Sequence, residues 1–149
     1  MKIRTETNQT LSEPEIVIRC HETYNTTALR ASLTKALAHQ QNLLLKKDDK
    51  EYYISPTEIL FFESADGRTY AHTATDIFTA RSRLYELSES LPNNFIRASK
   101  SIVINTSHVL SLTRNLAGSS LLEFRNSHKR TNVSRRYFKQ LRDKLNERS

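Results

Sequence analysis

Cysteine and glycine are scarce in this 149-residue chain, and each scarcity excludes a class of protein. The single cysteine, Cys20, cannot form an intramolecular disulfide, so the fold does not depend on disulfide bonds. Only two glycines, Gly67 and Gly118, are present, which excludes the glycine-rich loops of P-loop and dinucleotide-binding proteins. No glycine turn surrounds a serine as a hydrolase nucleophile requires, so we expect no enzyme and no cofactor.

Long apolar runs are also absent. Met1–Thr5 leads into no stretch that could serve as a signal peptide or a membrane span, so we expect a soluble, cytoplasmic protein. The five histidines are dispersed along the chain, and Cys20 and His21 would face opposite sides of a strand, so no metal site is expected. The length suits one domain, or one domain with an extension.

Positive charge is concentrated in the last third of the chain. The formal net charge is +7, but residues 1–96 hold 11 Lys/Arg against 13 Asp/Glu, whereas residues 97–149 hold 12 against 3. This distribution favours a polyanion as the partner of the C-terminal third. A basic surface that serves only solubility is the alternative.

Residues 1–45 predict an N-terminal β-α extension. Glu15–Cys20 has the β-branched residues of a strand, and Thr27–Gln40 predicts an amphipathic helix with Leu29, Leu33 and Leu37 on one face. The unit is too short to stand alone, so this apolar face must be covered by the sheet or by a second protomer.

Residues 46–149 predict a mainly β domain, α+β overall, of antiparallel strands with a short C-terminal helix. A strong hairpin turn is expected at Asp66-Gly67, because glycine tolerates positive φ. A helix is expected at Ser82–Leu91, and another at Ser134–Asn146 with Ser134 as its N-cap. The expected strands are Leu43–Lys46, Glu51–Ile54, Ile59–Glu63, Thr69–Thr73, Asp76–Ala80, Ser101–Asn105, His108–Leu112, Ser120–Arg125 and His128–Val133.

Two basic segments stand out in this domain. In Phe95–Asn105 a polar and basic turn, Arg97–Ser101, precedes an alternating apolar strand that would hold it rigid. At the second, Arg135 and Arg136 occupy the first positions of a helix, where the helix dipole disfavours cations by a few tenths of a kcal/mol unless an anion is bound. Phosphate is the obvious anion.

These segments resemble the LytTR DNA-binding domain of bacterial transcription regulators. The resemblance covers roughly residues 50–146 and rests on Ile59-Leu60-Phe61-Phe62-Glu63, Leu91-Pro92, Phe95-x-Arg97-x-x-Lys100-Ser101-x-Val103-x-Asn105 and Val133-Ser134-Arg135-x-Tyr137. It implies an elongated, mostly antiparallel fold that enters the DNA major groove with loops. The β-α unit before it lacks the alternating parallel strands and helices, and the acidic cluster at strand ends, of a receiver domain, so we expect a stand-alone regulator without one.

The resemblance places the groove-contacting positions on three loops. Arg68 is the best candidate in the first, although Asp66 or Gly67 could hold that place. Lys100 is the base-reaching residue of the second, and Arg135 matches the third. Ser99 stands where many members have histidine, so a hydroxyl replaces a ring contact.

Side-chain chemistry divides these residues into two roles. The forked donors of Arg135 suit guanine O6 and N7, whereas Lys100 can serve a base or a phosphate. Other basic residues are expected to contact phosphates and add affinity without sequence information: Arg97, Lys129, Arg130 and Arg136. The resemblance further suggests paired direct-repeat DNA elements, a homodimer on DNA, and weakly a regulatory membrane protein as partner.

Two other functions fit parts of the sequence. The aromatic pairs Tyr52-Tyr53 and Phe61-Phe62 could form a stacking platform for RNA or single strands, although core packing explains them equally. The second alternative is a module whose basic face binds an acidic protein, which would show no nucleic-acid binding at low salt. Preference for duplex over single strands separates the first alternative from duplex recognition.

Overall fold

The computed structural model describes residues 2–37 and 41–147, and most of its regular structure is antiparallel β-sheet with three α-helices. The helices are α1 (Thr26–Leu37), α2 (Leu84–Ser90) and α3 (Arg135–Asn146), and short 3₁₀ turns cover Pro56–Glu58 and Thr106–His108. The strands are β1 (Leu43–Lys47), β2 (Lys50–Ile54), β3 (Phe61–Ala65), β4 (Arg68–His72), β5 (Ile77–Ala80), β6 (Phe95–Ser99), β7 (Ile102–Asn105), β8 (Val109–Thr113), β9 (Ser120–Phe124) and β10 (Arg130–Val133).

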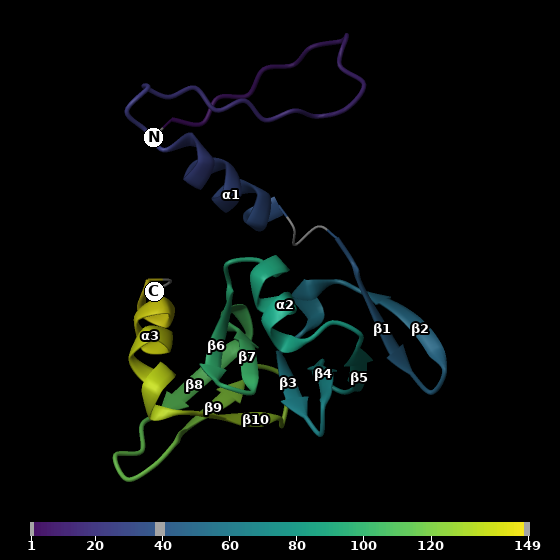
Figure 1. The fold of residues 1–149 in the computed structure, drawn as a ribbon, viewed down its shortest axis with the longest axis vertical. Coiled ribbons are helices and arrows are strands. Elements are labelled where there is room, and N and C mark those ends of the chain that lie inside the picture. The colour runs from purple at the N-terminus through teal and green to yellow at the C-terminus, as the bar shows by residue number, and fades with distance from the viewer. Residues whose placement is uncertain (1, 38–40, 148–149) are drawn as a thin grey trace.

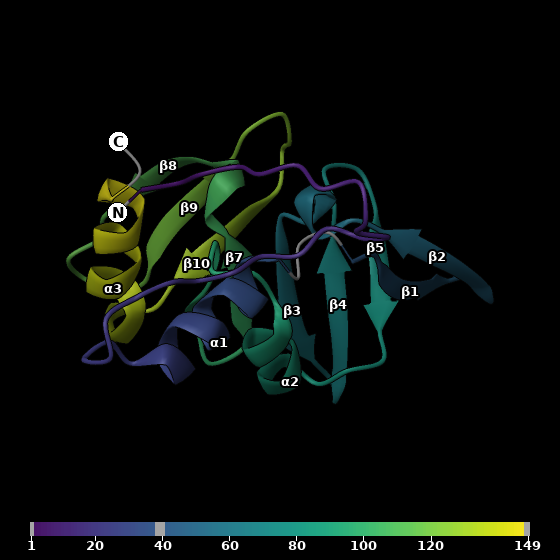
Figure 2. The same cartoon turned by 90° about the horizontal axis from the view of Figure 1, so that it is seen from above.

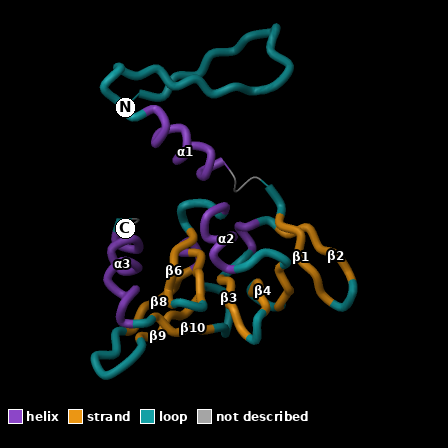
Figure 3. Tube along the Cα trace, in the orientation of Figure 1, coloured by secondary structure: helices purple, strands orange, loops and turns teal. Residues whose placement is uncertain are grey.

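The strands form two sheets (Figures 1 and 3). The larger has seven strands in the order β2-β1-β5-β4-β3-β7-β6, and the smaller has three in the order β10-β9-β8. Every neighbouring pair is antiparallel. The mainly β, antiparallel fold class expected from the sequence is therefore confirmed.

Two-residue turns close the first two hairpins of the large sheet. Asp48 and Asp49 have φ of 51° and 62°, and Asp66 and Gly67 have φ of 52° and 74°. Positive φ at both central residues matches the twist of the flanking strands, which is why Asp-Gly is a strong hairpin sequence. The predicted turn at Asp66-Gly67 is confirmed.

The large sheet is covered on both faces near its middle. On one face Phe62 packs with Leu84, Leu87 and Leu91 of the α2 region in one core. On the other face Phe61 packs with a second core made by the small sheet and α3. The neighbouring Phe61 and Phe62 are consequently 4% and 0% exposed, because successive strand residues point to opposite, equally covered faces.

The strand predicted at Glu15–Cys20 is wrong. Residues 15–20 form no strand, and Ile16, Val17 and Ile18 are 59%, 65% and 46% exposed. β-branched residues alone do not make a strand, because extended backbone needs a neighbour to pair with. The predicted helix is confirmed as α1 up to Leu37, and its last predicted residues, 38–40, lie outside the described residues.

α1 has no buried residue and stands apart from the sheets, on the side of the domain where α2 and the C-terminal end of α3 lie (Figures 1 and 2). Its apolar face is therefore not covered by the described part of the chain. The division between residues 45 and 46 falls inside β1, whose Leu45 is 2% exposed, so the packed domain includes all of β1.

The sequence also predicted a turn where the structure has a strand. Arg97 and Ser99 belong to β6, and only Lys100 and Ser101 form the turn to β7. The strand was hidden because its inward positions are irregular: the register shifts between Arg97 and Ser99 while Phe95 and Ala98 are buried.

Candidate nucleic-acid interface

The three loops expected to contact DNA lie side by side along one edge of the domain. The Ser64 amide, near the end of β3, donates to the Ser101 carbonyl at 2.8 Å, which joins the β3–β4 hairpin to the β6–β7 turn. The Ser134 amide donates to the Ala98 carbonyl at 2.9 Å, which joins the start of α3 to β6. Loops separated by up to 70 residues in sequence are thus tied together by backbone hydrogen bonds, at the lower edge in Figure 1.

The β-bulge at Ala98 provides the second connection. The Arg97–Ser99 register shift removes Ala98 from the regular ladder, and its carbonyl receives the Ser134 amide instead. The Ala98 side chain is 0% exposed and lies in the same core as Leu141 of α3. The bulge thereby sets the position of the α3 N-terminus relative to the β6–β7 turn.

The β3–β4 hairpin presents Arg68 at one end of this edge. Arg68 is the first residue of β4, is exposed, and pairs with Ala65 directly after the Asp66-Gly67 turn. A Cβ added at Gly67 would meet nothing within 4 Å, so this glycine serves the backbone conformation and not a close approach.

The β6–β7 turn is stiffened by its own polar side chains. Ser99 Oγ accepts from the Ser101 amide at 3.2 Å, and the Arg97 guanidinium donates to the Lys100 carbonyl. Ser99 therefore acts within the turn, and Lys100 is the exposed residue at its tip. Arg97 is half-buried and braces the turn that carries Lys100.

The start of α3 presents Arg135 and Arg136. Both are exposed; Arg135 Nη2 donates to the Leu116 carbonyl at 3.1 Å, and the Arg136 guanidinium lies 5.7 Å from the Tyr137 ring centroid. Ser134 is the N-cap residue as predicted, but its side chain makes no capping hydrogen bond. Within residues 2–37 and 41–147 its buried Oγ has no hydrogen-bond partner.

α3 packs on the domain through three side chains. Leu141 is fully buried, and Phe138 and Leu145 are partly buried against the same core. The guanidiniums of Arg114 and Arg142 lie 5.3 Å and 5.8 Å from the centroid of the Phe138 ring. These cation–π contacts hold further positive charge beside the helix.

Lys129 lies away from this edge. It precedes β10, whereas Ser134 follows it, and a four-residue strand spans about 13 Å. Lys129 Nζ donates to the Asp76 carbonyl at 2.6 Å and lies 3.5 Å from His72 Nδ1. Burial lowers the pKa of the Lys129 ammonium. Its assignment as a phosphate contact stays a prediction.

His72 completes a polar cluster between the two sheets. Its Nε2 lies 2.8 Å from Glu63 Oε1, and Phe61 stacks on its ring at 4.1 Å between centroids. Burial lowers the pKa of His72, opposed by the Glu63 hydrogen bond, while the nearby Lys129 charge also lowers it. In the neutral ring, Nε2–H donates to Glu63 and Nδ1 faces the ammonium, which agrees with both contacts.

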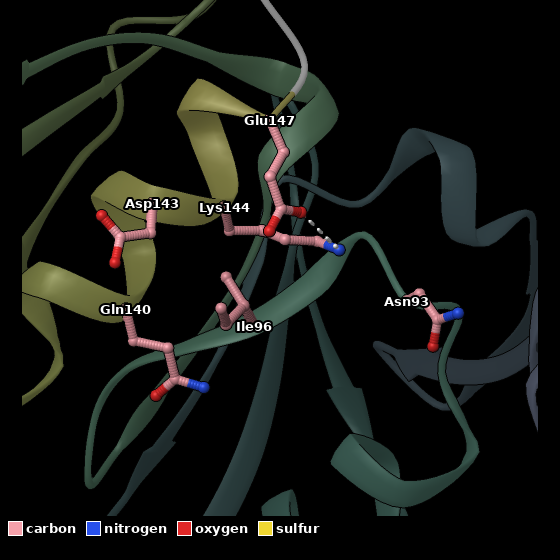
Figure 4. Close-up of a pocket in the computed structure, with 6 residues that line it drawn as sticks. All are labelled: Asn93, Ile96, Gln140, Asp143, Lys144 and Glu147. Carbon is pink, nitrogen blue, oxygen red and sulfur yellow. Dashed lines mark ion pairs between the residues drawn. The ribbon is translucent and has the colours of Figure 1, made fainter. Parts of the chain in front are cut away.

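A hollow of about 370 Å³ lies against the C-terminal half of α3 (Figure 4). Figure 4 shows Lys144 paired with Glu147 there, with 3.7 Å between Nζ and Oε2. The hollow is lined by Asn93, Ile96, Gln140, Asp143, Lys144 and Glu147. Two carboxylates against one ammonium make it unsuited to a phosphate backbone, in contrast to the cationic start of the same helix.

Sequence reasoning missed the β8–β9 loop, which reaches α3 through Arg114 and Leu116. Its only sequence signal was the turn composition of Arg114-Asn115 and Gly118. None of the helices within residues 2–37 and 41–147 has the length and hydrophobicity of a membrane-spanning segment.

Comparison with known proteins identifies the family of this domain. The family model described as "LytTr DNA-binding domain" matches residues 49–146. The chain belongs to the LytTR DNA-binding domain family. The predicted resemblance is confirmed, and residues 49–146 are its LytTR domain.

Similar proteins include solved and curated examples. The LytTr DNA-binding domain of a putative methyl-accepting/DNA response regulator from Bacillus cereus superposes with a TM-score of 0.65 at 25% identity, covering 70% of this chain and 96% of that one. An "Uncharacterized HTH-type transcriptional regulator" of Staphylococcus aureus strain NCTC 8325 / PS 47 is 33% identical over 98 residues, 65% of this chain. A counterpart from strain MRSA252 is 32% identical. The match spans 66% of the length of these curated relatives.

Proposed function

We propose that this chain is a sequence-specific duplex-DNA-binding transcription regulator that reads the major groove with loops. The observation that carries the proposal is the single edge on which Arg68, Lys100 and Arg135 are presented by three hydrogen-bonded loops. Cationic side chains on a rigid edge supply both phosphate attraction and base contacts. The names of the Staphylococcus aureus relatives support regulation of transcription.

The arrangement of the helices supports reading by loops. α2 and α3 are separated by five strands, and α1 and α2 by another five, so no two successive helices of the described chain form a helix-turn-helix. α3 presents only its N-terminal residues at the edge, and its following turns pack against β6 and the small sheet. Arg135 therefore acts as a residue of the edge and not of an inserted recognition helix.

The three residues proposed to read bases differ in chemistry. Arg135 offers a guanidinium fork to guanine, and Lys100 offers a point charge at the tip of a turn. Arg68 offers a further guanidinium at the β3–β4 end of the edge. Arg97 and Arg136 add phosphate contacts, and Ser99 shapes the turn through its bond to the Ser101 amide. A contact to a base is worth about 1–3 kcal/mol of discrimination.

Selection of duplexes from a random pool by the full chain tests the proposal. An enriched sequence should bind the wild-type chain more tightly than random duplex, and Arg135→Ala should weaken the enriched duplex by about 1–3 kcal/mol while leaving random duplex nearly unchanged. Arg125→Ala is the matched control, because Arg125 is exposed and follows β9 at the end away from α3. Failure to enrich any sequence, or equal losses on both duplexes, contradicts the proposal.

Single-strand or RNA binding is the other outcome of this experiment. Tyr52 and Tyr53 are 36% and 67% exposed, but they lie on β2, the edge strand opposite to β6 in the large sheet. The aromatic and cationic groups are thus at opposite ends of the sheet, whereas single-strand sites combine them in one groove. We expect single-stranded competitor to displace the enriched duplex poorly.

We further propose that two protomers bind paired direct repeats, with α1 as the contact between protomers. The apolar side chains Leu29 and Leu37 are 37% and 39% exposed, and no residue of α1 is buried. The segment before and within α1 has a balanced mix of charges, so it has no electrostatic reason to lie on DNA.

A further inference from the structure

The β8–β9 loop, residues 114–119, lies against the start of α3 but is not among the three loops that the sequence singled out. Two internal hydrogen bonds define its shape. The Asn115 amide donates to Oγ of the buried Ser120 at 3.1 Å, and Asn115 Oδ1 accepts from the Ala117 amide at 3.0 Å. An Asn side chain bonded to the backbone two residues on makes a stable local turn.

The loop is attached to α3 at two points. The Arg114 guanidinium lies 5.3 Å from the Phe138 ring centroid, and the Leu116 carbonyl accepts from Arg135 Nη2 at 3.1 Å. An arginine has five N–H donors in a planar fork, so one bond to a carbonyl restricts its orientation and leaves donors for a base. The loop therefore orients the guanidinium proposed to read guanine.

Leu116 also presents an apolar side chain at this point. It is 79% exposed, the most exposed large apolar residue of residues 43–147. One exposed leucine is ordinary on a protein surface, so its exposure alone does not indicate a contact surface. The position of Leu116 does point to one, because its backbone carbonyl is hydrogen-bonded to the Arg135 guanidinium.

We propose that the β8–β9 loop is a fourth DNA-contacting segment, in which the Leu116 carbonyl positions Arg135 and the Leu116 side chain contacts the methyl group of a thymine. The inference rests on the proposed major-groove function. Thymine C5-methyl is the apolar group that the major groove offers to an aliphatic side chain. The Leu116 Cα lies within about 6 Å of Arg135 Nη2 by standard backbone dimensions, which is under two base-pair steps of about 3.4 Å.

Deoxyuridine substitution tests this contact, because it removes the methyl group and keeps base pairing. The probe is the duplex that the full-length wild-type chain enriches from a random pool, with each thymine replaced in turn by deoxyuridine. We expect one substitution to weaken wild-type binding about four-fold, as the loss of one buried methyl group does. The sensitive thymine should lie within two base pairs of the position at which Arg135→Ala loses its preference.

The variants then assign the contact to Leu116. Leu116→Ala should weaken binding to the unmodified duplex about four-fold and show no further loss with deoxyuridine. Leu116→Met, which keeps an apolar side chain, should retain most of the affinity and of the deoxyuridine penalty. Leu110→Ala is the matched control: Leu110 is 56% exposed on β8 and outside the loop, so its deoxyuridine penalty should equal that of the wild type.

The outcomes separate this inference from the proposed function. If no duplex is enriched, both are wrong. If a duplex is enriched but has no sensitive thymine near the Arg135 position, or Leu116→Ala keeps the full deoxyuridine penalty, only the inference on Leu116 is overturned. A change in self-association of Leu116→Ala in sedimentation, with an unchanged penalty, would assign the side chain to a protein contact instead.

Discussion

Replacement of Asn105 by alanine should destabilise the domain more than any surface change at the edge that we propose binds DNA. Asn105 ends β7, the strand that begins after the Lys100-Ser101 turn, and it is 0% exposed. Its Nδ2 donates to the Ile59 carbonyl at 2.9 Å, and its Oδ1 accepts from Asn94 Nδ2 at 2.7 Å and from the Ser107 amide at 3.0 Å. One side chain thus joins the segments before β3, before β6 and after β7.

The expected loss follows from these three bonds. Each contributes about 1 kcal/mol net, and the Ile59 carbonyl loses a partner in a buried place, so Asn105→Ala should lower the free energy of unfolding by about 3–4 kcal/mol. With an m-value of about 2 kcal/mol/M, the urea midpoint falls by about 1.5–2 M. A domain of ordinary stability, about 5–15 kcal/mol, would still fold at room temperature.

Urea unfolding followed by circular dichroism measures this loss. Asn132→Ala is the matched control, because Asn132 is an exposed strand residue on β10 and should change the free energy of unfolding by less than about 0.5 kcal/mol. A loss below about 1 kcal/mol for Asn105→Ala would refute the reasoning, since it would mean that the three bonds are replaced by water at no cost.

Three further predictions concern pH, salt and assembly. Burial lowers the pKa of His72 below 6.5, so the unfolded chain takes up a proton first as pH falls, and the free energy of unfolding should decrease below pH 6.5. In urea titrations at pH 7.5 and 5, this decrease should be smaller for His72→Gln, whereas the control His128→Gln, at an exposed histidine, should keep the wild-type decrease. In duplex binding, log K should fall with log salt at a slope of about −4 to −5. Lys129→Ala should flatten this slope by about one if Lys129 contacts a phosphate. An unchanged slope together with reduced stability would show instead that Lys129 serves the contact with the Asp76 carbonyl. A chain that begins at Asn42 keeps all of β1 and should bind one repeat with nearly full affinity, yet lose cooperativity on paired repeats and sediment as a monomer. Insertion of half a helical turn of DNA, about 5 base pairs, between the repeats should likewise abolish cooperative binding by the full chain. Dimeric behaviour of the shortened chain would place the contact between protomers in the sheets.

The mainly β class and the hairpin turns could be predicted because their causes are local. Asp66-Gly67 favours positive φ in a turn that joins two strands, and the helix expected at Ser82–Leu91 needs only a neighbouring apolar surface to cover its leucines. The family motif also needs no coordinates, since it is read in chain order. For these features the residues themselves contain the physical reason.

The strand errors have the opposite origin. Ile16, Val17 and Ile18 have the β-branched pattern of a strand but no neighbouring strand, whereas Arg97 and Ser99 lack the pattern and are paired with β7 all the same. Pairing partners come from distant parts of the chain, and tertiary contacts override local preference.

The sequence by itself determined which chemistry the chain carries: a basic last third, arginines at the start of a helix, and a LytTR motif. Only the tertiary structure decided which basic groups share one edge, because that depends on single hydrogen bonds between segments such as Ser134 to Ala98. The tertiary structure also places the Leu116 carbonyl against the Arg135 guanidinium, which the sequence did not predict, and directs the Lys129 ammonium to the Asp76 carbonyl. Charge is a property of composition, but the place where a charge is presented is set by backbone pairing, which no local pattern encodes.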